Sequence, residues 1–192
     1  DVATVLPEGL IIAACLPRQD VRDAFISLKV QRLADLPQGA TVGTSSLRRQ
    51  AQILRVRPDL KVIGFRGNVE TRLRKLADGL ADATLLACAG LNRLGMSDRI
   101  TSPVALSEML PAVAQGAVGI ECRAGDSLTR ERVQALDHAE TSVWVAAERA
   151  FLATLDGSCR TPIAGLARLA AGKLSFQGEI LTPDGREHHA AS

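Results

Sequence analysis

Cys159 lies in the stretch LDGSCRTPIAG, at a position that we expect to be exposed, and cysteine is the most reactive residue type there. It follows a Gly-Ser pair where a predicted helix gives way to a predicted strand, so its side chain can reach outward. Structural cysteines are more often buried inside an element, as we expect for Cys88 and Cys122. Positive charge at Arg149 and Arg160 would favour the nucleophilic thiolate. The pattern makes Cys159 a candidate for chemistry, with an inert thiol as the alternative.

A second group of candidates follows three consecutive predicted strands, in GTSSLRRQ, FRGNVETRLRK and AGLNRLG. In the first stretch, backbone N–H groups and the positive end of the helix dipole favour an anion. Ligands at the carboxyl ends of parallel strands share one edge of a sheet. The residues that could bind an anion there are Thr44, Ser45, Ser46, Arg48, Arg49, Arg66, Gly67, Arg72 and Arg93.

The charge distribution supports an anion site in this part of the chain. Between Thr44 and Arg99 the excess of Lys and Arg over Asp and Glu is +6, although the whole chain carries only +2. Arginine presents a rigid fork suited to carboxylate or phosphate. The alternative is an ordinary capped helix with surface arginines, but three successive strand ends favour a polyanion site.

Two further stretches carry weaker signals. PAVAQGAVGIECR contains Gln115 among small residues, a composition that lets a chain or a ligand approach closely or packs a buried connection. Asp1 would by itself be read as a frayed end. The three histidines form no convincing catalytic pair, and the phosphate-binding glycine motifs are missing.

The elements that position these residues alternate between strand and helix, which predicts an α/β fold with a parallel sheet. Ser46 caps one predicted helix that Pro58 ends, and Gly79 closes another that follows KVIGF, a predicted buried strand. After Gly157, turn signals separate two or three strands with no helix between them, which predicts a small antiparallel unit. The other predicted strands are 41–46, 83–90 and 116–123, and the other predicted helices lie near 127–137 and 141–155.

Composition excludes several classes of protein. Hydrophobic residues make up 46% and charged residues 23% of 192, which is typical of a soluble globular protein. The chain shows no membrane-spanning apolar run and no signal segment, so we expect a cytoplasmic protein without a membrane partner. Four Phe, one Trp and no Tyr leave little for base stacking, which argues against nucleic acid as a partner.

Taken together, these stretches resemble the porphobilinogen deaminase (hydroxymethylbilane synthase) family over almost the whole chain. The stretches that carry the resemblance, in order, are DV, PRQDVRDAF, LPQGATVGTSSLRRQAQI, RPDLKVIGFRGNVETRLRKL, DATLLACAGLNRLG, LPAVAQGAVGIECR, AERAFL and LDGSCRTPIAG.

The resemblance implies a covalent cofactor and a set of site residues. Cys159 would carry a dipyrromethane through a thioether, and Asp1 would be the catalytic carboxylate between pyrrole rings. Gln115 would lie near the hinge crossing. The resemblance implies that the carboxylates of cofactor and substrate pair with Arg48, Arg49, Arg66, Arg72 and Arg93. Thr44, Ser45 and Ser46 would assist in binding these carboxylates.

The implied reaction is the stepwise deaminative condensation of four porphobilinogen units onto this primer, followed by hydrolytic release of hydroxymethylbilane. It requires no metal, and we expect a monomer. The alternative from another class is a solute-receptor-like lobe that binds a carboxylated ligand without chemistry.

The implied fold has periplasmic-binding-protein-like lobes with mixed, mainly parallel sheets and a small α+β C-terminal domain with an antiparallel sheet. Residues 1–16 and 117–135 would belong to domain one, 20–110 to domain two and 139–192 to domain three. Parts of domains one and three would be missing, so we expect these residues alone to be inactive.

Overall fold

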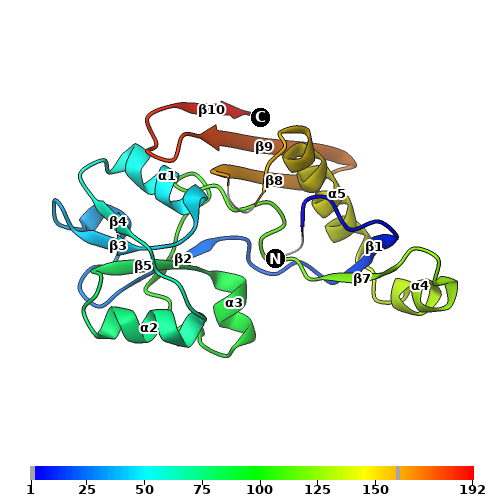
Figure 1. Ribbon diagram of the computed structural model, residues 1–192, viewed down its shortest axis with the longest axis horizontal. Coiled ribbons are helices and arrows are strands. Elements are labelled where there is room, and N and C mark those ends of the chain that lie inside the picture. The colour runs from blue at the N-terminus through cyan, green and yellow to red at the C-terminus, as the bar shows by residue number, and fades with distance from the viewer. Residues whose placement is uncertain (1–2, 159–160) are drawn as a thin grey trace.

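The computed structural model describes residues 3–158 and 161–192, and its strands form three separate sheets (Figure 1). The largest sheet has five strands in the order β4-β3-β5-β2-β6. Strand β3 pairs parallel with β4 and β5, whereas β2 pairs antiparallel with β5 and β6. The predicted mixed sheet is confirmed, but its pairings are evenly divided and not mainly parallel. The strands are β2 (Asp23–Ser27), β3 (Thr41–Gly43), β4 (Lys61–Ile63), β5 (Ala83–Ala87) and β6 (Ser102–Pro103).

Helices cover both faces of this sheet (Figure 1). Because successive strand residues point to opposite faces, β2 contributes to two separate cores. Phe25 packs with Ile53 of α1 on one face, while Ala24 packs with Leu76 of α2 and Leu91 of α3 on the other. The helical elements of this part are α1 (Leu47–Val56), α2 (Val69–Ala77), α3 (Cys88–Arg93) and the short 3-10 helices η1 (Leu33–Asp35) and η2 (Ser97–Arg99).

The ends of α1 and α2 follow the predicted signals. The Ser46 side chain accepts a hydrogen bond from the backbone N–H of Arg49, and α1 ends two residues before Pro58. Asn68 caps α2 in the same way. Gly79, with φ +77°, adopts the left-handed conformation that lets the chain leave the helix.

Three predicted strands of this sheet are shorter in the structure, and the one predicted at 41–46 ends at Gly43. The segment predicted as a buried strand at 61–65 is shorter and forms the sheet edge, with Ile63 37% exposed, because β4 pairs only with β3. The segment predicted as strand 83–90 ends at Ala87, since Cys88 begins α3. Strand β2 was not predicted, because its five buried residues show no alternation of polar and apolar side chains.

The second sheet joins two segments that are far apart in the sequence. Strand β1 (Leu10–Cys15) pairs antiparallel with β7 (Gly119–Arg123), and α4 (Ser127–Gln134) contacts both strands. Strand β1 was not predicted, whereas the strand predicted at 116–123 is present in shortened form. The pairing could not be read from the sequence, because it depends on contacts across more than 100 residues.

Two chain segments cross between these sheets side by side. The backbone N–H groups of Leu16 and Gln19 donate to the carbonyl oxygens of Val118 and Gly116, over 2.9 and 3.1 Å. Gly116 has φ +86°, and a Cβ atom there would lie 2.7 Å from the Gln19 carbonyl oxygen. The predicted close approach of the chain in this small-residue stretch is therefore confirmed.

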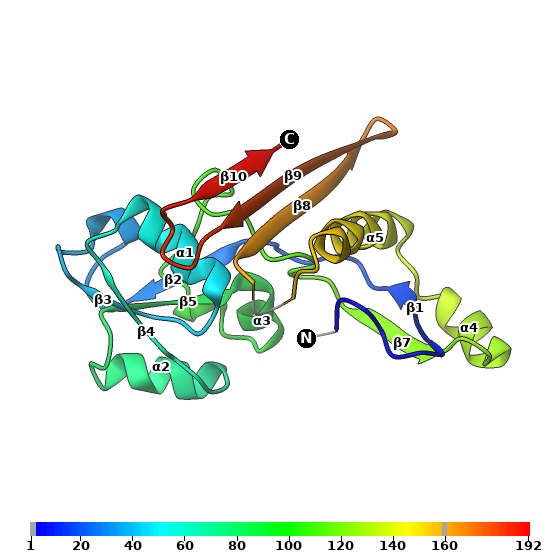
Figure 2. The same cartoon turned by 45° about the horizontal axis from the view of Figure 1, so that its top comes forward.

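The third sheet is the predicted antiparallel unit. Its strands β8 (Ile163–Ala170), β9 (Lys173–Leu181) and β10 (His188–Ala191) lie in the order β10-β9-β8. Helix α5 (Ala139–Thr154) packs against β8, and the β8–β9 hairpin projects from the molecule (Figure 2). Gly185, in the β9–β10 turn, has φ +71°, and a Cβ atom there would lie 2.5 Å from backbone atoms of α1.

A buried ion pair links the crossing segments to α5 and β8. Glu148 on α5 has a side chain that is 0% exposed, and its oxygens lie 2.6 and 3.0 Å from the terminal nitrogens of Arg18. The same carboxylate accepts hydrogen bonds from the backbone N–H groups of Ala114 and Ala167. Four donors on three segments thus converge on one acid.

Within the described ranges, no helix has the length and apolar character needed to cross a bilayer.

Candidate functional site

The loop from β3 to α1 places the first group of predicted residues. Thr44 is 3% exposed, and its hydroxyl accepts a hydrogen bond from the Ser46 backbone N–H over 3.2 Å. Ser46 in turn caps α1, so Ser45 is the exposed residue of this turn. The hydroxyl group of Thr44 therefore shapes the turn, while Ser45 and Ser46 line a cavity.

Arg48 and Arg49, in the first turn of α1, are buried and face Asp23 at the start of β2. Their terminal nitrogens lie 2.8 and 2.7 Å from the two carboxylate oxygens of Asp23, whose side chain is 0% exposed. Burial alone would raise the pKa of Asp23, but the charges and hydrogen bonds of Arg49 and Arg48 outweigh it and hold this pKa well below its usual range. The group carries a net charge of +1.

The second strand end positions Arg66 and Arg72. Gly67 has φ +127°, and a Cβ atom there would lie 2.7 Å from the Thr71 side chain, so glycine permits the turn. The Gly67 carbonyl oxygen accepts a hydrogen bond from Arg72 Nε over 2.8 Å, which orients that guanidinium. Burial lowers the pKa of Arg72, and the neighbouring positive charge of Arg49 lowers it further. Like charges are therefore held together here.

One cavity of about 950 Å³ brings most of these groups together. Its volume lies within the range of about 300–1,000 Å³ that is common for small-molecule sites. Neither Arg66 nor Arg72 forms an ion pair with a carboxylate within residues 3–158 and 161–192, so their charge is available to a ligand. The predicted site residues that line the cavity are Ser45, Ser46, Arg48, Arg49, Arg66, Arg72 and Gln115.

Three predicted residues do not line this cavity: Thr44, Gly67 and Arg93. Arg93 is exposed at the end of α3, and its Nη2 donates to the Gly116 carbonyl oxygen over 2.9 Å. Thr44 and Gly67 shape the two loops described above. These residues hold the walls of the site in place, and the prediction that they contact a ligand stays a prediction.

The predictions for Asp1 and Cys159 fall outside the described residues. Ser158 and Thr161, which flank the second gap, both line the cavity. The Thr161 hydroxyl accepts from the Ser158 backbone N–H and donates to the Ser158 carbonyl oxygen, over 2.8 and 2.7 Å. Of the other cysteines, Cys88 is buried as predicted, whereas Cys122 is half-buried.

Sequence reasoning missed Asp23 and the place of Arg149. Arg149 lines the cavity, and its Nη2 donates to the carbonyl oxygens of Ala3 and Thr4. The signal for Asp23 was an acid that opens the apolar run DAFI, where a buried carboxylate needs a cationic partner. The sequence does not say which cation that is.

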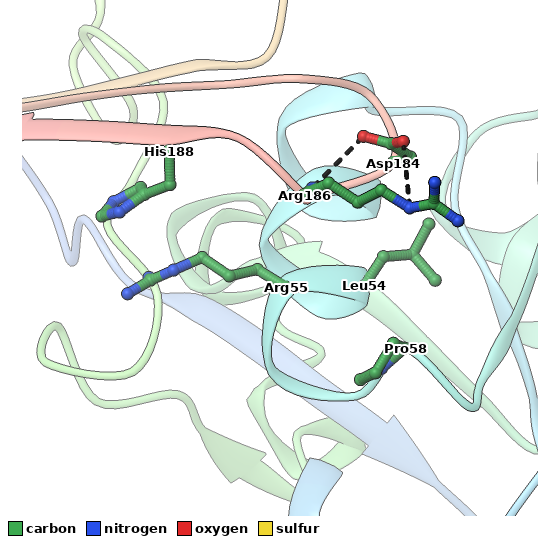
Figure 3. A pocket seen from close by; sticks show the side chains of 7 residues that line it. Leu54, Arg55, Pro58, Asp184, Arg186 and His188 are labelled. Carbon is green, nitrogen blue, oxygen red and sulfur yellow. Dashed lines mark hydrogen bonds and ion pairs between the residues drawn. The ribbon is translucent and has the colours of Figure 1, made fainter.

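A smaller pocket of about 470 Å³ lies where the β9–β10 turn meets α1 (Figure 3). Its basic side chains already have partners. Arg55 and His188 both contact Glu179, at 3.4 and 3.0 Å, and Arg186 lies 3.5 Å from Asp184. This pocket contains none of the predicted site residues, so we interpret it as a contact region between α1 and the third sheet.

The fold and the large cavity define an α/β protein with a cavity lined by several arginines. Two family models match the chain: "Porphobilinogen deaminase, dipyromethane cofactor binding domain" over residues 1–131 and "Porphobilinogen deaminase, C-terminal domain" over residues 143–191. The chain belongs to the porphobilinogen deaminase family.

Curated relatives carry the same family name. The porphobilinogen deaminase of Paracoccus denitrificans (strain Pd 1222) is 57% identical over 191 residues, which cover 100% of this chain and 61% of the relative. That of Nitrobacter hamburgensis is 57% identical over 189 residues, covering 98% of this chain and 60% of the relative. The chain thus spans about three fifths of the length of these relatives.

The solved structures that match parts of this chain include two binding proteins. A periplasmic binding protein from Brucella ovis with glutathione bound has a TM-score of 0.43 at 17% identity, covering 66% of this chain and 40% of that one. A nutrient binding protein from Burkholderia cenocepacia bound to methionine has a TM-score of 0.40 at 13% identity, covering 77% and 67%.

Proposed function

We propose that this chain carries the arginine-lined part of a hydroxymethylbilane synthase. The reaction is the stepwise deaminative condensation of four porphobilinogen units, followed by hydrolytic release of hydroxymethylbilane. Family membership supports the reaction class, and the name of the matched family model supports the cofactor. The observation that carries the proposal is the cavity in which Arg66 and Arg72 have no carboxylate partner among the described residues.

Dipyrromethane, when bound through a thioether to Cys159, supplies the pyrrole carbon from which the chain of rings is extended. The cavity residues suit this group because each ring bears two carboxylates, acetate and propionate. Arg66 and Arg72 neutralise these carboxylates, and hydrogen bonds between ionised partners are about twice as strong as neutral ones. Ser45 and Ser46 add hydroxyl donors at the start of α1. Clustered cations, whose charges repel one another in the free protein, then bind the carboxylates with little reorganisation.

Asp1 provides a carboxyl group, which the arginines cannot provide. We assign it the stabilisation of positively charged pyrrole rings and the handling of their protons. Thr44, Gly67 and Arg93 contribute by holding loops in place, and Gln115 does so at the crossing. The roles of Thr44, Gly67, Arg93 and Gln115 are supported by their hydrogen bonds, whereas the role of Asp1 rests on the family resemblance alone.

We propose domain boundaries that give each domain one of the three sheets. Residues 1–16 and 117–135 form the part of domain one present here, with β1 and β7 as its sheet. Residues 20–110 form domain two around the five-stranded sheet, and 139–192 form domain three with α5 and the antiparallel sheet. The working form is a cytoplasmic monomer whose partner is porphobilinogen, with no nucleic acid and no membrane.

The test is the denatured intact mass of the longest natural protein that carries this sequence, together with its consumption of porphobilinogen. We expect a covalent adduct of dipyrromethane size that disappears in Cys159→Ser. Cys122→Ser is the matched control, because this half-buried thiol lies on β7 and outside the cavity lining, and it should keep the adduct. A protein without adduct or turnover would support the binding-lobe alternative instead.

A further inference from the structure

Asp23 is a buried carboxylate that connects three of the predicted site residues, namely Arg48, Arg49 and Gln115. Its Oδ1 accepts from Arg49 Nε and Nη2, over 3.0 and 2.7 Å, and from Gln115 Nε2 over 3.1 Å. Its Oδ2 accepts from Arg48 Nη1 over 2.8 Å. Gln115 closes the group, because its Oε1 lies 3.4 Å from Arg48 Nη2. One buried carboxylate therefore fixes the orientation of both guanidinium groups.

The two arginines differ in how many N–H groups they have left for a ligand. A guanidinium carries five N–H donors. Arg48 Nη1 donates to Asp23, to the Gln52 side chain and to the Leu110 carbonyl oxygen, and Nη2 donates to Asp23 and Gln115. Its Nε is buried and has no hydrogen-bond partner in the described part of the chain. Arg48 therefore has no accessible donor to offer.

Arg49 is committed less completely. Its Nε and Nη2 both donate to Asp23 Oδ1, and its Nη1 donates to the Leu85 carbonyl oxygen over 3.0 Å. One N–H on each terminal nitrogen is left over. The Arg49 side chain is 10% exposed, against 4% for Arg48, and it lines the cavity close enough to Arg72 to lower the pKa of that residue.

We propose that Asp23 is a positioning residue that aims Arg49 into the cavity, so that Arg49 contacts a ligand carboxylate while Arg48 serves as a buried counter-charge. The inference rests on the proposed function and refines it, because it assigns different roles to adjacent arginines. With Arg48, Asp23 and Arg49 combined, the group presents one net positive charge. A second uncompensated cation at this depth would be costly without a bound anion.

The experiment uses the longest natural protein that carries this sequence, with cofactor loading measured by intact mass and with KM and kcat for porphobilinogen measured on the loaded fraction. We expect Asp23→Asn to raise KM at least about tenfold, with a smaller change in kcat, because the Arg49 fork is no longer aimed. Asp23→Asn combined with Arg49→Gln should match Arg49→Gln alone. If Asp23 had only a structural role, Asp23→Asn would reduce the yield of folded protein and leave KM of the folded fraction unchanged, and this result would overturn the proposal. The proposal is also overturned if the KM increases of the two single variants multiply in the double variant.

Arg48→Gln and Arg49→Gln decide the matter if Asp23→Asn does not fold. Arg49→Gln should impair KM at least about tenfold more than Arg48→Gln does. For a variant that does not load cofactor fully, the fraction of protein that carries cofactor is compared in place of KM. Arg49→Gln should again be impaired more than Arg48→Gln. Equal or reversed effects refute the proposal. Arg74→Gln, on the exposed surface of α2, is the matched arginine control.

Failure of this inference is distinguishable from failure of the proposed function. Absence of adduct and turnover in the unaltered protein refutes the function. An adduct in the unaltered protein, combined with the wrong order among the variants, refutes only the role of Asp23.

Discussion

Glu148→Gln should destabilise the fold strongly, because it removes the charge that compensates a buried arginine. The side chains of Arg18 and Glu148 are 3% and 0% exposed, so water cannot replace the lost partner. Breaking a buried pair in this way costs roughly 3–5 kcal/mol. The glutamine amide would also turn an N–H₂ group toward donors that now face carboxylate oxygens, namely Arg18, Ala114 and Ala167.

The cost is large relative to the total stability. Domains are stable by about 5–15 kcal/mol, so a loss of roughly 3–5 kcal/mol removes about a fifth or more of the unfolding free energy. For a chain of this size, the same loss lowers Tm by about 6–20 °C, at about 2–4 °C per kcal/mol. Denaturant unfolding of the longest natural form measures the change as a shift in midpoint at constant m-value.

A double variant separates the charge effect from packing. Arg18→Leu combined with Glu148→Leu leaves no uncompensated charge, so it should be more stable than the sum of the two single changes predicts. Asp35→Asn, which breaks the exposed pair with Arg32, is the control and should leave the midpoint unchanged. A Glu148→Gln loss below about 1 kcal/mol would refute the reasoning, because it would mean that the buried charge needs no partner.

Three other changes test separate parts of the structure. Gly185→Ala should lower the unfolding free energy more than Gly172→Ala does. Both glycines have positive φ, but only at Gly185 would a Cβ atom lie 2.5 Å from backbone atoms of α1. Equal losses in denaturant unfolding would contradict this prediction. Because the pKa of Asp23 is lowered in the folded state, its contribution to stability is present above the unfolded pKa of about 3.9 and is lost as pH falls below it. Unfolding free energies measured from pH 5 to pH 2 should therefore fall less steeply in Asp23→Asn, and identical slopes would count against the ion pairs. Arg72→Gln should raise KM for porphobilinogen about 10- to 100-fold through loss of one charged hydrogen bond, while Arg74→Gln should not, and steady-state kinetics would expose equal effects.

Local signals predicted much of the fold. The predicted cap at Ser46 and the predicted helix end at Gly79 are formed by hydrogen bonds and backbone angles within a few residues, so the sequence specifies them directly. The turn at Gly172 belongs to the same class. These features were predictable because the free energy that decides them is local.

Strand pairing was less predictable. Strand β2 reads as a run of buried residues without alternation, and its antiparallel place between β5 and β6 depends on partners about 60 and 80 residues away. The pairing of β1 with β7 is a contact of the same kind. No local propensity distinguishes such a strand from any other apolar stretch.

The sequence by itself determined which residue types stand at the strand ends, and so where Arg49, Arg66 and Arg72 could meet a polyanion. Only the tertiary structure decided that Arg48 is consumed by Asp23 and its neighbours, because a side chain's hydrogen-bond partners depend on what the folded chain brings within 3 Å. Arg48 and Arg49 are adjacent and chemically identical in the sequence, and burial next to one carboxylate makes them different.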